Sequence, residues 1–259
     1  MSIPAIPGQE IDAPWLMQRR PPGQAFFATF TQAYATLQTP SLQSAGQGGT
    51  QEAGQRLLAG LLGQTHADMS RRRGVSLEDQ AAYAGILERA YTSGGMLDPV
   101  GFLRGLSPAE LGVVQRNHAL GLPIRPEALG REGASNLLLP EGYAYDLNGD
   151  DLIDRGNAQL IQFPPTGAPP AFTKAWQAAT QDLNPGDAAS YGLAMFTAMH
   201  TVPVGDRTMG QRLPGDDLSN YRQVAQDYLA MLEGFRAHLA QGQYERDKAF
   251  FGRLLSAMG

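Results

Sequence analysis

One stretch near the C-terminus constrains the fold most, because its apolar side chains recur at alternating steps of three and four residues. These side chains are Leu218, Tyr221, Ala225, Tyr228, Leu232, Phe235 and Leu239. A strand would need a period of two, so this spacing predicts a long amphipathic helix. We expect its apolar seam to pack against helices of the same chain. The alternative is a homodimer through a coiled coil over 218–239, which we favour less because sustained coiled coils need more heptads with charged flanks.

Other segments share the helical period, so the expected fold class is mainly α: a multi-helix bundle with an irregular central segment. Apolar spacing predicts helices over 24–38 and 52–63. Further helices should start at Ser76, at Asp98 followed by Pro99, and at Ser107, where Pro108 and Glu110 complete a capping box. The last of these should stop near Gly121, because Gly suits the left-handed residue after a helix.

Proline and glycine divide the chain into four parts. Residues 1–22 carry five prolines and predict a flexible arm, and residues 23–121 predict the first helical part. Residues 122–170 lose the helical period, so we expect an irregular segment that includes short strands. Residues 171–259 predict a second helical part, which could form one domain with 23–121.

Composition excludes several classes of protein. A net charge of −5 lacks the basic field of a general nucleic-acid binder. The run Arg71, Arg72 and Arg73 is an exception, which we interpret as a solvated stretch before a helix rather than a phosphate patch. No signal peptide or membrane-spanning run is present, so we expect a soluble protein, cytoplasmic or exported without a signal. With no cysteine, the compartment cannot be read from redox chemistry.

The stretch 146–157 has the ligand spacing of a twelve-residue calcium loop. Oxygen-bearing side chains stand at positions one, three, five, nine and twelve, namely Asp146, Asn148, Asp150, Asp154 and Asn157. Ca²⁺ is a hard cation that takes six to eight oxygen ligands, and this alternation turns successive side chains toward one centre. The carbonyl of Leu152 would supply position seven, and Ile153 would anchor the loop at position eight. We therefore predict a calcium site with six ligands from the chain.

This loop resembles that of an EF-hand, and more closely that of a dockerin. The resemblance covers only 146–157 and implies a bound calcium ion. Asn157 stands where these families carry a carboxylate, and Asp151 stands where the turn usually has Gly. The alternative is an acidic surface turn in which Asp and Asn bond to their own backbone. Mg²⁺ fits less well because it demands stricter octahedral geometry.

None of the common catalytic motifs is present with the residue spacing that it requires. No serine elbow, phosphate loop or zinc-protease pair is present. His118 should be a core residue, whereas His200 ends a predicted helix and is followed by Asp206 and Arg207. We expect a noncatalytic calcium-binding structural or interaction protein, with a protein as its partner. The alternatives are a hydrolase with a site near His200 and Asp206, and a secreted adaptor or effector.

Overall fold

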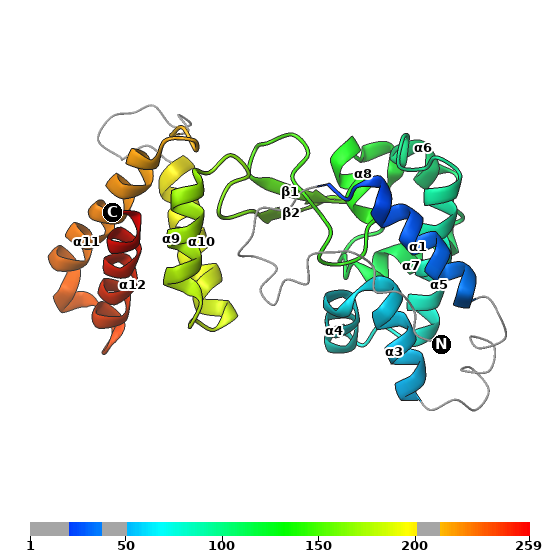
Figure 1. Ribbon diagram of the computed structural model, residues 1–259, viewed down its shortest axis with the longest axis horizontal. Coiled ribbons are helices and arrows are strands. Elements are labelled where there is room, and N and C mark those ends of the chain that lie inside the picture. The colour runs from blue at the N-terminus through cyan, green and yellow to red at the C-terminus, as the bar shows by residue number, and fades with distance from the viewer. Residues whose placement is uncertain (1–20, 38–50, 201–212) are drawn as a thin grey trace. The chain divides into compact units, whose positions relative to one another are not determined.

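The computed structural model describes residues 21–37, 51–200 and 213–259, which form two compact units (Figure 1). One unit extends to Leu160, and the other runs from Ile161 to Gly259. The boundary therefore falls inside the segment 122–170 that the sequence sets apart. Three segments lie outside the described residues: 1–20, 38–50 and 201–212. The first of them holds most of the predicted arm.

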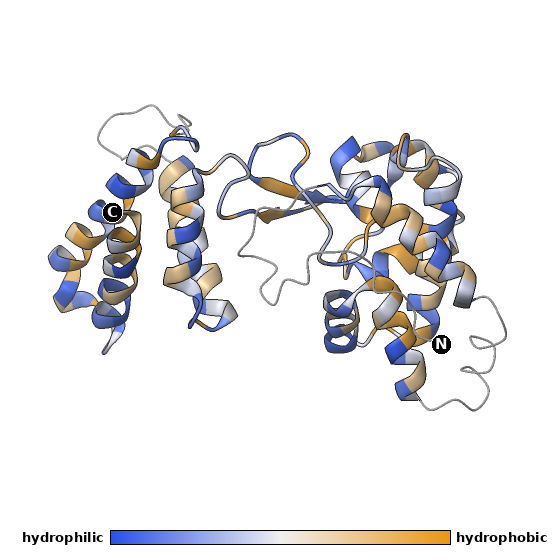
Figure 2. Ribbon diagram, in the orientation of Figure 1, coloured by the Kyte–Doolittle hydropathy of each residue, from blue (hydrophilic) through white to orange (hydrophobic). Residues whose placement is uncertain are grey.

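The first unit is a set of helices that ends in a two-stranded hairpin. Its elements are α1 (Gln24–Leu37), α3 (Gln51–Leu62), α4 (Gln64–Arg73), α5 (Leu77–Thr92), α6 (Pro99–Arg104), α7 (Pro108–Asn117), η1 (Pro126–Ala128), α8 (Arg131–Leu137), β1 (Leu152–Arg155) and β2 (Ala158–Ile161). Helix α5 is central to the core, because Tyr83 and Leu87 are fully buried among side chains from α1, α3 and α8. Figure 2 shows the apolar residues of these helices in orange.

The second unit contains α9 (Pro170–Thr180), α10 (Pro185–His200), α11 (Leu218–Phe235), η2 (Arg236–His238) and α12 (Gln243–Met258). Its core is aromatic. Phe172 stacks on Tyr221 with ring centroids 3.8 Å apart, and Trp176 meets Phe250 edge-on. Apolar area of this kind is the main favourable contribution to folding.

Six of the seven residues of the seam that most constrains the fold lie on α11, and Leu239 follows η2, so the helix ends four residues before the predicted seam does. Tyr221, Ala225 and Leu232 are buried against α9, α10 and α12 of the same unit, as expected. Phe235, at the end of the helix, is 59% exposed. The mainly α fold class is confirmed, and no helix in the described ranges is long and apolar enough to cross a membrane.

The predicted helix starts are correct. The hydroxyl of Ser76 accepts the N–H of Asp79 at 3.0 Å, and Asp98 accepts the N–H of Gly101 at 2.9 Å. Ser107 and Glu110 form both halves of the capping box. Each start depends on residues three positions apart, which is why the sequence alone identifies it.

Two local expectations are wrong. Helix α7 ends at Asn117, before Gly121, because Ala119 takes the left-handed conformation with φ 51°. Within the segment expected to be irregular, residues Arg131–Leu137 form helix α8. The run Arg71, Arg72 and Arg73 does precede a helix, α5, as expected, and it forms the last turn of α4.

Candidate metal-binding loop

The carboxylate of Asp146 is the point around which the loop turns. Its Oδ1 accepts the N–H of Gly149 at 2.6 Å, and its Oδ2 accepts the N–H of Asp151 at 2.9 Å. Asp146 is only 7% exposed. Asp151 has φ 67°, so it takes the left-handed conformation that calcium loops usually assign to Gly at position six. Asp is one of the few residues with a side chain that visits this region.

Asn148 and Asp150 form two successive side-chain turns on the exposed side of the loop. Oδ1 of Asn148 accepts the N–H of Asp150, and Oδ1 of Asp150 accepts the N–H of Leu152, each at 2.9 Å. These are the bonds expected of an acidic surface turn. They do not exhaust the acceptors, because a carboxylate offers about four lone-pair sites and an amide oxygen two.

A buried carboxylate from outside the loop holds both of its halves. Oε2 of Glu132, on α8, accepts the N–H groups of Leu147 at 3.0 Å and Asn148 at 3.3 Å. Its Oε1 accepts the N–H of Asp154 at 2.9 Å. Burial raises the pKa of Glu132, and these three bonds oppose that rise. Positions two, three and nine of the loop are thus tied to one side chain.

Two more residues of α8 complete this support. The side-chain amide of Asn136 donates to the carbonyls of Tyr145 and Asp154, and its oxygen accepts the N–H of Tyr145. At Gly133 the backbones approach so closely that an added Cβ would lie 2.5 Å from the carbonyl oxygen of Gly156. Sequence reasoning missed all three residues of α8, because no spacing motif joins them to the loop.

The second half of the loop is the hairpin rather than an exiting helix. Ile153 is buried at position eight, as predicted, and Leu152 begins β1. The carboxylate of Asp154 accepts the side-chain amide of Gln159 at 2.9 Å. Asn157 lies in the turn between the strands, where it lines a small cavity of about 170 Å³ beside Leu120 to Ile124. Position twelve is therefore part of a tight turn.

The six predicted ligands thus lie along one stretch of the chain, but the bonds to Asp146 close only its first half, from Asp146 to Asp151. Across residues 21–37, 51–200 and 213–259, no three His, Asp or Glu side chains gather as a metal ion would require. No family model, curated protein or solved structure matches this chain.

Within the second half of the loop, strand β1 carries a charge into the core. The guanidinium of Arg155 is 5% exposed, and one of its nitrogens lies 2.8 and 2.9 Å from the two carboxylate oxygens of Glu141. Arg73, on α4, donates to the same carboxylate at 3.1 Å. Burial raises the pKa of Glu141, but the charges of Arg155 and Arg73 outweigh burial and hold that pKa at about 2.

Two buried histidines border this ion cluster. Nδ1 of His66 accepts the N–H of Glu141 at 3.1 Å, so its ring proton is on Nε2, 3.2 Å from the amide oxygen of Asn117. Nε2 of His118 lies 2.9 Å from the hydroxyl of Tyr83 and 3.1 Å from the carbonyl of Leu137. Burial lowers the pKa of His66 to about 4 and that of His118 to about 3.

His118 is thus the core residue that the sequence predicts. For His66, no acidic companion is visible in the sequence, because Glu141 lies 75 positions away. In the second unit, Nδ1 of His200 donates to the carbonyl of Phe196 at 2.8 Å, and the two rings stack. Asp206 and Arg207, its predicted companions, lie outside the described residues.

Proposed function

We propose that residues 146–157 bind a calcium ion and that the protein is a noncatalytic calcium-binding structural or interaction protein. The bond from the N–H of Asp151 to Asp146 carries this proposal. It closes the loop at position six around the carboxylate at position one, which is the turn that calcium loops use Gly to make. The six proposed ligands are Asp146, Asn148, Asp150, the Leu152 carbonyl, Asp154 and Asn157.

The rigidity of the surroundings supports this reading. Glu132 and Asn136 hold the backbone on both sides of the loop, and Ile153 anchors it to the core. A backbone ordered in advance lowers the entropy that a ligand must offset on binding. The ion would draw the exposed carboxylate of Asp150 toward the buried carboxylate of Asp146 and so rigidify the segment.

We expect weak affinity. Position twelve offers an amide rather than a carboxylate, and several proposed ligand oxygens already accept main-chain N–H groups. Calcium loops with fewer charged ligands fall in the range of extracellular modules, with Kd roughly 10⁻⁴ to 10⁻³ M. Such a site would fill where calcium is millimolar and stay largely empty in cytosol. Its occupancy by calcium would therefore depend on whether the protein lies inside or outside the cell.

Calorimetric titration of the chelator-treated chain with calcium tests the proposal, together with thermal melting. The variant Asp146→Ala with Asp150→Ala removes both central carboxylates. We also suggest Asp150→Asn, because Asp150 is exposed and the change keeps the acceptor that bonds Leu152. The matched control is Asp182→Asn, an exposed aspartate of the second unit.

Saturable binding with a raised melting temperature, lost in the double variant and weakened in Asp150→Asn, would support the proposal. The control should bind as the wild type does. An absence of binding heat at millimolar calcium would reduce 146–157 to an acidic turn. Equal binding by the wild type and the double variant would lead to the same conclusion.

A further inference from the structure

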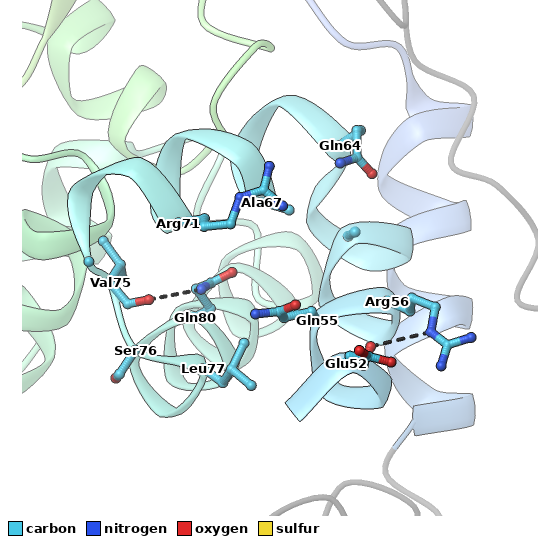
Figure 3. Close-up of a pocket in the computed structure, with 12 residues that line it drawn as sticks. Glu52, Gln55, Arg56, Gln64, Ala67, Arg71, Val75, Ser76, Leu77 and Gln80 are labelled. Atoms are coloured by element: carbon cyan, nitrogen blue, oxygen red, sulfur yellow. Dashed lines mark hydrogen bonds between the residues drawn. The ribbon is translucent and has the colours of Figure 1, made fainter. Parts of the chain in front are cut away.

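A groove opens in the first unit between α3, α4 and the start of α5, far in sequence from the calcium loop (Figure 3). Its volume is about 570 Å³, within the usual range for small-molecule sites. Polar side chains from all three helices line it: Glu52, Gln55, Arg56, Gln64, Arg71 and Gln80. Helices α3 and α5 meet closely beside it, because a Cβ added at Gly54 would lie 3.1 Å from the side chain of Leu77.

Gln80 is the decisive residue of the groove. It is 4% exposed, and its Nε2 donates to the carbonyl of Val75 at 3.1 Å. This bond fixes the orientation of the amide, so that its Oε1 faces the groove as an acceptor (Figure 3). Among the described residues, none donates a hydrogen bond to this oxygen. A largely buried side chain therefore presents to the groove an acceptor that has no protein donor in the described part of the chain.

Two further groups converge on the same space. Figure 3 shows Gln55 reaching from α3 toward Gln80, and Arg71 extending from α4 above them. Arg71 uses one nitrogen to bond Asp68 at 2.6 Å, which leaves most of its five N–H donors for another partner. The side chain of Arg71 is 66% exposed, so a ligand can reach it from solvent.

The charges of the lining indicate the sign of a ligand. Among the lining residues, Arg56 and Arg71 are positive and Glu52 is negative, while Asp68 beside the groove pairs with one nitrogen of Arg71. Arginine pairs with a carboxylate through two parallel hydrogen bonds. Gln55 can donate and accept at once, which suits an amide of a ligand. Small residues, Ala59, Ala67 and Gly74, leave room for it.

We propose that this groove binds a small ligand that carries an amide N–H next to a carboxylate, the chemistry of an N-acylated amino acid. The ligand N–H donates to Oε1 of Gln80, its carboxylate pairs with Arg71, and its acyl carbonyl accepts from Gln55. This gives the Oε1 acceptor of Gln80 a donor and gives Arg71 a second carboxylate partner. The site is independent of calcium.

Titration of the ¹⁵N-labelled full chain with N-acetylglycine, followed by NMR, tests the site. Acetate, which lacks the amide, and N-methylacetamide, which lacks the carboxylate, are the matched probes. The variant Arg71→Gln removes the guanidinium that would pair with the carboxylate of the ligand. Arg71 lies on the exposed last turn of α4. Arg72→Gln removes the neighbouring exposed charge, which does not line the groove, and serves as its control.

We expect saturable shifts of the Gln80 and Gln55 side-chain amides with N-acetylglycine at millimolar concentration. Loss of a charge-assisted pair should weaken binding about tenfold in Arg71→Gln and leave Arg72→Gln unchanged. Acetate and N-methylacetamide should each bind more weakly. The proposal fails if Gln80 does not shift, if acetate binds as well as N-acetylglycine, or if Arg71→Gln binds as the wild type does.

Discussion

The carboxylate of Glu132 lies 2.9 Å from the main-chain nitrogen of Asp154, although 22 residues separate them in the sequence. The same carboxylate bonds the N–H groups of Leu147 and Asn148. The seven-residue helix α8 therefore supports the loop, although no spacing motif in the sequence joins the two.

Replacement of Glu132 by Gln should destabilise the first unit. The amide keeps the shape but turns one NH₂ donor toward a main-chain donor, so at least one of the three bonds is lost in a buried place. We expect the free energy of unfolding to fall by about 1–3 kcal/mol, measured by denaturant titration. Glu127→Gln, on an exposed turn nearby, should leave the midpoint unchanged. Equal midpoints for both variants would contradict the support role of Glu132.

Replacement of Ala119 by Gly should stabilise the first unit. Ala119 follows α7 with φ 51°, a conformation that costs a residue with a Cβ about 1 kcal/mol. The change should therefore raise the melting temperature of this unit by a few degrees. The matched variant Ala82→Gly, at an exposed site inside α5, should lower it, because Gly weakens a helix interior. Shifts of the same sign in both variants would count against this reasoning.

Acidification should destabilise the first unit below about pH 6.5, the ordinary pKa of histidine. His66 and His118 have folded pKa values of about 4 and about 3, so between pH 6.5 and 4 the unfolded chain binds protons that the folded chain does not. The free energy of unfolding should therefore fall with falling pH, by about 2–3 kcal/mol per pH unit near pH 5.

Thermal melts across pH 7.5 to 4.5 would measure this slope, and NMR titration would follow the two rings directly. The exposed His238 is the control, since His238→Gln should leave the slope unchanged. A melting temperature that stays constant from pH 6.5 to pH 5 would show that the histidines titrate normally.

Replacement of Arg155 by Met should be strongly destabilising, because it leaves Glu141 buried with only Arg73 as its charged partner. We expect a loss of about 3–5 kcal/mol in chemical denaturation. Glu141→Gln added to Arg155→Met should recover part of it, since no uncompensated charge then remains. Arg71→Met removes an exposed pair with Asp68 and should cost less than about 1 kcal/mol. A double variant less stable than Arg155→Met alone would contradict this account.

Sequence predicted what short-range contacts and apolar periodicity determine. The start of α5 at Ser76 depends on a residue three positions away, and the seam of α11 depends on a regular period. The ligand spacing of the loop is equally local. These features need no knowledge of the rest of the chain.

The elements that escaped prediction bury polar residues. Helix α4 turns His66 and Ser70 inward, and α8 buries Glu132 and Asn136, so neither shows an apolar stripe. The partners of these side chains lie far along the chain, as Glu141 does from His66. The groove at Gln80 is formed by three helices and has no motif of its own.

The hairpin has a mechanical consequence. The division between the units falls between Leu160 and Ile161, at the end of β2, so β2 is both the partner of β1 and the segment by which the chain leaves the first unit. Tension transmitted from the second unit would peel β2 from β1 before it loaded α8. Asp154 would then lose its hydrogen bond from the side chain of Gln159, so tension between the units would act directly on the proposed ligand at position nine.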